Sequence, residues 1–217
     1  MKRRTLPTAA ALVAAAGLLL TACGGGDDSS ASNDKIAGAD TGSAAAASPS
    51  TSASGGADRP KIAFPSYAKN VFEDQKTGDV TKDAVLADSA MSVDSMDDAI
   101  FKRSTGTRVL GFFNTDKALN AAITYVQGYI DKNDVWIGET RYFDRKVTLS
   151  GDRQAYVTYC SDESKSFLKN TKTHKVDKTP TSADSYVLYH TSLAKNAQDV
   201  WQTTNIVSNR GDKACQP

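Results

Sequence analysis

The sequence predicts an α+β domain in which N-terminal helices pack on a strongly curved antiparallel sheet. Two observations lead to this fold class. Apolar residues recur at helical spacing in segments 81–103 and 115–131, and from residue 141 onward they alternate with a period of two. Helices followed by a run of strands is the segregated order typical of α+β folds. A signal peptide and a disordered linker are predicted to precede the domain.

The two predicted helices differ in how clearly the sequence marks them. The first starts at Thr81, whose hydroxyl makes it a good N-cap, and runs as one long or broken helix toward Arg103. The second starts at Asn114 or Thr115 and is the clearest helix of the chain. Its apolar residues all fall on one face: Leu119, Ala122, Ile123, Val126 and Ile130. This face is predicted to cover the sheet.

The second half of the domain reads as a meander of antiparallel strands. Four strands are predicted, at residues 141–149, 154–160, 185–193 and 200–207. Turn-forming residues at 150–152 and 196–198 join them in pairs. The polar, lysine-rich segment 164–179 is predicted to be an excursion from the sheet, with a short strand near Phe167.

Residues 1–22 have the pattern of a secretory signal, with a basic start, an apolar run and small residues before Cys23. They resemble a bacterial lipoprotein signal, in which the cysteine receives the lipid. The resemblance implies a diacylglyceryl group with palmitate chains on Cys23, and a place on the extracytoplasmic face of the cell membrane. The alternatives are an ordinary secretory signal and a membrane-spanning helix. Pro7 and Thr21 argue against the helix, since spanning takes about 20 apolar residues.

Residues 23–59 form a linker rich in Gly, Ala and Ser. It contains one large aliphatic residue, Ile36, and no aromatic residue, so it cannot bury enough apolar surface to fold. The globular domain is predicted at residues 60–217. Loss of Lys2, Arg3 and Arg4 with the signal would change the formal charge from +1 to −2. The remaining charges are interspersed, which argues against a nucleic-acid partner.

The cysteine count predicts one disulfide. With Cys23 assigned to the lipid, Cys160 and Cys215 remain as an even pair in an oxidising compartment. The alternative is two separate buried thiols. No histidine or cysteine lies at metal-ligand spacing from either one, and no phosphate-binding glycine loop or nucleophile elbow is present. The sequence therefore predicts no metal and no cofactor.

Several blocks of the domain resemble a group of secreted actinobacterial lipoproteins. These blocks are residues 72–87, Arg141-Tyr142, the segment 159–164, and the ending 201–215. Those proteins are similar in layout to the NTF2-like superfamily, which includes ketosteroid-isomerase-like proteins. The resemblance covers about residues 60–217. It implies helices in front of a strongly bent, four-stranded antiparallel sheet that forms a cone.

Enzymes of this superfamily place an acid or base inside the cone, with a tyrosine or an acid that donates to an oxyanion. The resemblance therefore makes His190 a candidate base, and Tyr186 or Tyr142 a candidate donor. Weaker candidates for the base are Asp144, Asp162 and His174. No residue matches a catalytic motif position by position.

The role of His190 depends on which face of its strand lines the cone. If the face with Tyr186, Leu188 and His190 points inward, His190 is available as a base. The opposite register puts Val187, Tyr189 and Leu193 inside and leaves His190 in water. Many aromatic residues accompany this strand, and they fit either core packing or a partly apolar pocket.

The functional hypothesis is a membrane-tethered, non-catalytic module that binds a protein partner or a small apolar ligand. The alternative is a ketosteroid-isomerase-like or cyclase-like enzyme that acts on a small apolar substrate. A solute receptor of a transporter would need two lobes around a cleft, for which about 160 residues are too few. The superfamily resemblance also allows a homodimer formed across the open sheet face.

Overall fold

The computed structural model describes residues 58–217; the predicted signal, Cys23 and the linker up to residue 57 lie outside the described residues. The helices are α1 (Val80–Phe101), α2 (Arg108–Phe113) and α3 (Asp116–Lys132), with short 3-10 turns η1 (Ala183–Ser185) and η2 (Lys213–Cys215). The strands are β1 (Ala68–Phe72), β2 (Asp134–Leu149), β3 (Gln154–Asn170), β4 (Val176–Asp177), β5 (Tyr186–Lys195) and β6 (Trp201–Arg210).

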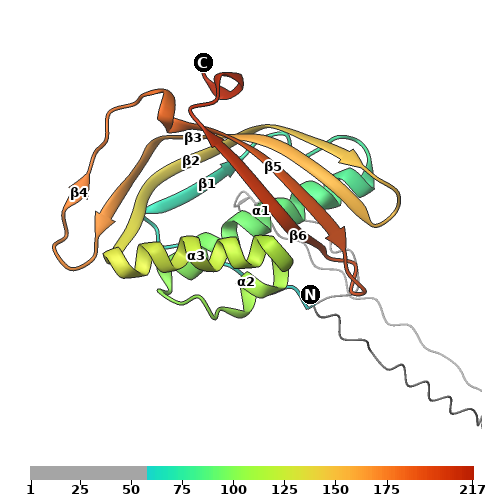
Figure 1. Ribbon diagram of the computed structural model, residues 1–217, viewed down its shortest axis with the longest axis horizontal. Helices are drawn as coiled ribbons and strands as arrows, with labels where there is room; N and C mark the ends of the chain where they lie inside the picture. The colour runs from blue at the N-terminus through green and yellow to red at the C-terminus, as the bar shows by residue number, and fades with distance from the viewer. Residues whose placement is uncertain (1–57) are drawn as a thin grey trace, which may run out of the picture. The chain divides into compact units, whose positions relative to one another are not determined.

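The domain has two layers. A curved sheet bends over the helices, which all lie on one of its sides (Figure 1). The strand order is β1-β2-β3-β5-β6, and β4 pairs only with β3. The pairs β2–β3, β3–β5 and β5–β6 are antiparallel. The predicted α+β class, with helices on one face of a curved sheet, is confirmed, and the sheet is antiparallel except for the pairing of β1 with β2.

The sheet has six strands rather than the four implied by the resemblance. The main addition is β1, which pairs in parallel with β2 so that Ala68 lies opposite Gly138. Its five residues are too few to show a periodic pattern, and their partner strand lies far along the chain. This is why the sequence did not reveal β1.

Strands β2 and β3 form a long hairpin around the predicted turn at 150–152. The prediction that 164–179 leaves the sheet is wrong for its first part, because β3 continues to Asn170 and pairs back to Asp134. Polar residues continue the strand here because one face is solvated and the other faces a cavity. Bulges in β2, between Glu139 and Arg141 and between Phe143 and Lys146, accompany the bend of the sheet.

Helix α1 is unbroken over 22 residues. Its N-cap is Asp79 and not the predicted Thr81: the Asp79 carboxylate accepts the backbone N–H groups of Thr81 (2.8 Å) and Lys82 (3.0 Å). Both residues are good N-caps. Asp79 has the extended backbone typical of an N-cap, with a φ of −106° and a ψ of 117°, and Gly78 before it has a positive φ of 85°. The N-cap therefore lies two residues earlier than predicted.

The main core lies between α1 and the sheet. Leu86 and Val93 of α1 pack with Val157 of β3, Leu193 of β5 and Trp201 of β6. Helix α1 is nevertheless lined with buried polar residues. Among them, Ser92 and Ser95 bond the side chain of Asn114 at 2.7 Å and 2.9 Å. This network fixes α1 against the junction of α2 and α3.

Helix α2 was not predicted, since six residues are too short for a helical period; the Thr107 hydroxyl caps it. Helix α3 begins after Thr115, as predicted, and ends at Asn133, which adopts a left-handed conformation with a φ of 57°. The two helices lie next to α1, so α1 is covered on several sides. A helix covered in this way needs no single apolar stripe.

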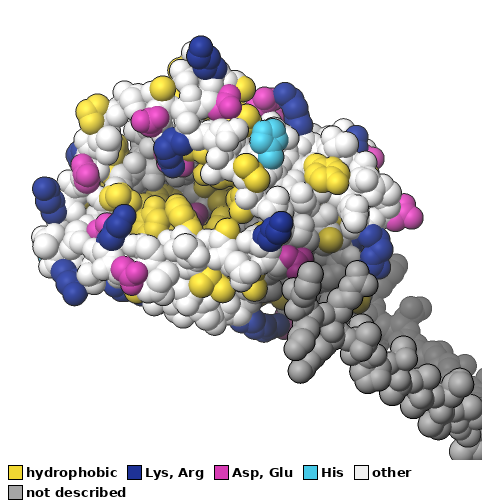
Figure 2. All heavy atoms as spheres, viewed as in Figure 1, with side chains coloured by type: hydrophobic (Ala, Val, Ile, Leu, Met, Phe, Trp, Pro, Cys, Tyr) yellow, Lys and Arg dark blue, Asp and Glu magenta, His cyan; other side chains and the backbone are white. Residues whose placement is uncertain are grey.

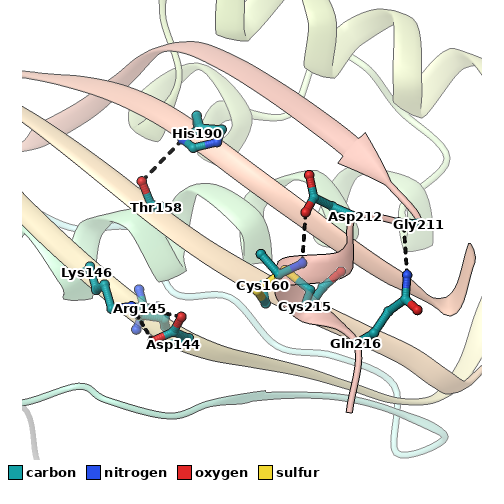
Figure 3. Close-up of a disulfide and its surroundings, with 12 residues drawn as sticks. Asp144, Arg145, Lys146, Thr158, Cys160, His190, Gly211, Asp212, Cys215 and Gln216 are labelled. Carbon is teal, nitrogen blue, oxygen red and sulfur yellow. Dashed lines mark hydrogen bonds and ion pairs between the residues drawn. A yellow bond between two sulfur atoms is a disulfide. The ribbon is translucent and has the colours of Figure 1, made fainter. Parts of the chain in front are cut away.

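The predicted disulfide is confirmed. Cys160 of β3 and Cys215 of η2 are bonded, with their Cα atoms 5.5 Å apart. Figure 3 shows the bond where the end of the chain folds back onto the sheet. Both cysteines are buried, 1% and 2% exposed, because the η2 turn covers this part of the sheet.

The first contact of the described chain is made by Arg59, the last residue of the predicted linker. Its guanidinium pairs with Asp88 of α1, which is 2% exposed. Asp88 also accepts the backbone N–H of Trp201 at 2.8 Å. This buried carboxylate therefore connects the start of the domain, α1 and β6.

None of the helices within residues 58–217 has the length and apolar character that a membrane span requires.

Candidate functional site

A cavity of about 430 Å³ lies between the helices and the inner face of the sheet. Figure 2 shows the hollow, with hydrophobic side chains in its wall and charged side chains around it. Its lining comes from α1, α3 and strands β2, β3, β5 and β6: Val93, Met96, Asp97, Ala121, Ala122, Tyr125, Tyr129, Trp136, Thr140, Tyr142, Tyr159, Glu163, Ser166, Tyr189, Ile206, Ser208 and Arg210. This volume is in the range of small-molecule sites.

Three neighbouring strands contribute one tyrosine each to the cavity wall. Tyr159 and Tyr189 lie directly opposite each other on β3 and β5, and their rings stack 4.9 Å apart. Tyr142 of β2 meets Tyr159 edge-on at 6.0 Å. Within residues 58–217, the hydroxyls of Tyr142 and Tyr159 make no hydrogen bond. Burial raises the pKa of both phenols above their usual range, so both stay neutral and can donate or accept.

Asp97 of α1 is the acidic group inside this aromatic wall. The residue is 7% exposed. The indole nitrogen of Trp136 donates to its Oδ1 at 2.8 Å, and the amide of Asn70 donates to its Oδ2 at 2.8 Å. Two donors from β2 and β1 therefore orient a helix carboxyl group at the cavity surface. No arginine, lysine or histidine of the described chain forms an ion pair with it.

The surroundings of Asp97 disfavour its charged form. Burial raises the pKa of Asp97 to about 7, and the charges of Asp94 and Glu163 act in the same direction. The hydrogen bonds from Asn70 and Trp136 oppose this shift without cancelling it. Asp97 can therefore gain or lose a proton near neutral pH.

Asn70 of β1 links Asp97 to a second acid. Its Nδ2 donates at 2.8 Å to Asp94 and at 2.8 Å to Asp97, while its Oδ1 is buried and has no partner in the described chain. Burial raises the pKa of Asp94 to about 6, although the Asn70 bond and the charge of Arg145 favour its ionised form. The two carboxyl groups thus share one amide donor, and of the two Asp97 is the one that lines the cavity.

The remaining charges of the cavity pair with each other. Arg210 of β6 donates to Glu163 of β3 at 2.8 Å and to the carbonyl oxygen of Asp184 at 2.6 Å. The side chains of Arg210 and Glu163 are 52% and 29% exposed, so the pair lies at the solvent side of the cavity. Among the ionisable lining residues other than tyrosine, Asp97 is therefore the one without an oppositely charged partner in the described part of the chain.

Tyr142 lines the cavity, but its two predicted partners do not. Strand β5 turns Val187, Tyr189, Thr191 and Leu193 inward, so His190 and Tyr186 point away from the cavity. His190 is exposed, and its Nδ1 lies 3.3 Å from the Thr158 hydroxyl on the outer side of the sheet (Figure 3). The expectation of His190 as a base in the cone, with Tyr186 as donor, is therefore corrected.

The weaker candidates also lie outside the cavity. Asp144 is exposed and pairs with Lys146, Asp162 pairs with Arg141, and His174 lies in the exposed turn before β4. Within residues 58–217, no group of three or more histidine, cysteine, aspartate or glutamate side chains is arranged to hold a metal ion.

Sequence reasoning missed Asp97 because it lies in a serine- and aspartate-rich stretch that resembles a solvated helix face. A signal was present nevertheless. Val93, Asp97 and Ile100 are spaced four and three residues apart, so Asp97 shares one face of α1 with two buried apolar residues. An acid flanked on its own helix face by buried apolar residues indicates a buried carboxyl group.

Comparison with known proteins finds no matching family model and no matching curated protein. Similar solved structures include a ketosteroid isomerase-like protein from Erwinia carotovora atroseptica SCRI1043, at 12% identity and a TM-score of 0.39, which covers 58% of this chain and 93% of that one. A candidate ketosteroid isomerase from Shewanella frigidimarina NCIMB 400 has 11% identity, a TM-score of 0.33, and coverage of 60% and 98%.

The intermembrane space region of the chloroplast protein ARC6 is also similar, with 11% identity and a TM-score of 0.37 over 62% of this chain and 98% of that one. Identities and TM-scores this low support no inference about activity. The functional conclusion has to come from the cavity itself.

Proposed function

We propose that this protein is a membrane-tethered, non-catalytic lipoprotein whose NTF2-like domain binds a small, mostly apolar molecule outside the cytoplasm. The observation that carries the proposal is the cavity of about 430 Å³ with its aromatic wall and the carboxyl group of Asp97. Apolar surface supplies affinity in such sites, and a few polar groups set the orientation. The order of helices before a curved sheet supports the NTF2-like assignment.

Native mass spectrometry of the full-length protein, purified from the cells that make it, tests ligand binding. The proposal expects an extra mass of small-molecule size on the wild type. Ser208 lines the cavity on β6 and is exposed, so Ser208→Trp would fill the space with little effect on folding. The extra mass is expected to disappear in this variant.

Asn209→Trp is the matched control, since Asn209 is the exposed next residue and does not line the cavity. It is expected to keep the ligand. A wild type that carries no extra mass, or equal retention of the ligand by both variants, would contradict binding in this cavity.

The lipid tether rests on the sequence of residues 1–23. Two or more acyl chains hold a protein stably on a membrane, so a diacylglyceryl group on Cys23 is a sufficient anchor. Cys23→Ala is expected to move the protein from the membrane fraction to the soluble extracytoplasmic fraction. Mass spectrometry of the wild-type N-terminal peptide would show the lipid; an unmodified Cys23 would refute the tether.

A second candidate function is that of a ketosteroid-isomerase-like or cyclase-like enzyme, and Asp97 is the observation that favours it. A carboxyl group with a pKa of about 7 suits general acid–base work near neutral pH, and neutral tyrosines can donate to a developing oxyanion. Turnover of an apolar ketone that rises with pH through about 7 and is abolished in Asp97→Asn would establish this function in place of simple binding.

The proposal leaves room for a homodimer through the outer face of the sheet, where Tyr156 and Val207 are 49% and 51% exposed. These two residues face away from the cavity, so a dimer would leave the ligand site open. Sedimentation equilibrium of wild type and Tyr156→Asp tests it: a dimer that the substitution dissociates supports this interface, and a monomeric wild type excludes it.

A further inference from the structure

Resting on the proposed ligand-binding function, we propose that the cavity selects an organic cation: a protonated amine on a flat apolar body, with the ammonium group beside Asp97. The charge balance of the cavity and the chemistry of its wall both favour such a ligand.

The charge balance favours a positive ligand. The ionisable lining residues other than tyrosine are Asp97, Glu163 and Arg210, and the last two form an ion pair at 2.8 Å. Asp97 is 7% exposed and has only neutral hydrogen-bond donors, the side chains of Asn70 and Trp136. A buried carboxylate without a cation is strongly disfavoured. This free-energy cost is removed either when Asp97 binds a proton or when a positively charged ligand lies beside it.

The groups around Asp97 strengthen the negative potential at this end. Asp94 faces it from the same helix and Glu163 from β3, and both carboxylates act against its ionisation. Arg145 acts on Asp94, and Arg210 is engaged with Glu163 at the solvent side. The phenols of α3, β2 and β5 that face it (Tyr125, Tyr129, Tyr142 and Tyr189) are uncharged. No described cation is left to neutralise Asp97.

The wall is also suited to a cation. Six aromatic side chains surround the space: Tyr125, Tyr129, Trp136, Tyr142, Tyr159 and Tyr189. The faces of such rings carry partial negative charge and attract ammonium groups, most strongly where water is excluded. The same rings stack on a flat apolar body. Aromatic faces and a carboxylate therefore act together on the same ligand class.

Binding and proton release are coupled in this site. Because burial raises the pKa of Asp97 to about 7, the carboxyl group is partly protonated near neutral pH in the free protein. A cation beside it favours the ionised form and lowers the pKa, so the proton leaves to solvent. A neutral ligand that accepts a hydrogen bond would instead retain the proton. The number of protons released thus distinguishes the two modes.

The test uses three probes with one ring system: 2-naphthylmethylamine, which is protonated near neutral pH, the ketone 2-acetonaphthone, and the anion 2-naphthoate. Calorimetry on the full-length protein measures their affinities. The amine is expected to bind at least about tenfold tighter than the ketone, and the anion weakest. In buffers of different ionisation enthalpy, the amine should release about half a proton near pH 7 and almost none above pH about 8.5.

Asp97→Asn should weaken binding of the amine at least about tenfold and leave the affinity for the ketone nearly unchanged. Asp98→Asn is the matched control: Asp98 is the next residue, pairs with Lys102 and does not line the cavity, so both affinities should stay as in the wild type. If Asp97→Asn fails to fold, proton release by the wild type remains decisive.

Each other outcome overturns the inference in a recognisable way. Equal or tighter binding of the ketone, without proton release, would show that Asp97 acts as a neutral donor; cation selection would fail while small-molecule binding would stand. Binding of none of the three probes would overturn cation selection for this ring system, whereas the proposed binding function is decided by the native mass spectrometry of wild type and Ser208→Trp.

Discussion

The indole nitrogen of Trp136 lies 2.8 Å from a carboxyl oxygen of Asp97, so strand β2 donates a hydrogen bond to helix α1 at the wall of the cavity. The bond joins the two layers of the domain at the point where its chemistry is concentrated. Both residues are almost fully buried, so loss of either partner leaves the other without this hydrogen bond in a poorly solvated place.

Trp136→Phe removes this donor while it keeps an aromatic ring. The pKa of Asp97 is expected to rise further, because one of the two bonds that favour its ionised form is lost. The free energy of unfolding should fall by about 1–3 kcal/mol. NMR titration of the Asp97 carboxyl carbon measures the first effect and urea unfolding the second.

Tyr129→Phe is the control for this substitution. It removes a hydroxyl from the same cavity that bonds Tyr125 and not Asp97, so the pKa of Asp97 should change far less. An Asp97 pKa that stays constant or falls in Trp136→Phe would show that the indole bond does not favour the carboxylate.

Stability should increase as the pH falls from about 8 to about 5. The pKa values of Asp97 and Asp94 are raised to about 7 and about 6, above the 3.8 of the unfolded chain, so in this range the folded state binds more protons than the unfolded state. The gain is more than about 1 kcal/mol. It ends below pH about 4, where acids with lowered pKa values, such as Asp199, become protonated.

Asp97→Asn identifies the source of this pH dependence. The substitution removes the titrating group with the larger shift, so the slope of unfolding free energy against pH should flatten between about 8 and 5. Urea unfolding of wild type and variant at several pH values measures the difference. Wild-type stability that rises with pH through this range would be inconsistent with a buried, proton-binding Asp97.

Gly138→Ala should destabilise the domain by about 2–4 kcal/mol. Gly138 has a φ of 100°, and a Cβ atom there would overlap the carbonyl oxygen of Lys165 on the neighbouring strand. The substitution therefore adds backbone strain and a steric clash at the centre of the bend. Thermal and urea unfolding give the size of the effect.

Gly151→Ala separates these two contributions. Gly151 also has a positive φ, 70°, but its Cβ would meet no atom within 4 Å. Only strain applies there, with a loss of about 1 kcal/mol. Equal losses at the two positions would mean that the close approach of β2 and β3 is unimportant.

Replacing both cysteines of the disulfide, as Cys160→Ala with Cys215→Ala, should lower the free energy of unfolding by about 2–4 kcal/mol. The bond closes a loop with a sequence separation of 55 residues and so restricts the unfolded chain. Reduced wild type should match the double variant in urea unfolding. Peptide mapping that finds two free thiols in protein from its own cells would disprove the bond.

How far the sequence predicted the fold depends on the element. The alternation of β5 was visible, but both of its faces carry a tyrosine and an aliphatic residue, so Tyr186 with Leu188 and Val187 with Tyr189 were equally good inner faces. The pairing of Tyr189 with Tyr159 of β3 is what makes the face with Val187 and Tyr189 the inner one. Long-range register is a property of the whole sheet, and this is why the candidate His190 could not be decided from its own strand.

The candidate site was predicted less completely than the fold. Tyr142 was named and lies in the cavity wall, whereas Asp97 was not named although it is the central acid. Its carboxyl group is oriented by two donors, Trp136 and Asn70, that lie far from it in sequence. A local pattern can mark a carboxyl group as buried, but it cannot show which distant groups bond it.

The place of β1 in the chain has a consequence for the order of folding. Pairing of Ala68 with Gly138 closes a loop of about 70 residues, whereas the β2–β3 hairpin forms around a short turn. Short-range contacts form first, so β1 should join an already assembled hairpin. It carries Asn70, the donor shared by Asp94 and Asp97. The polar end of the cavity is therefore completed last, and a fluctuation that frees this short edge strand would open it first.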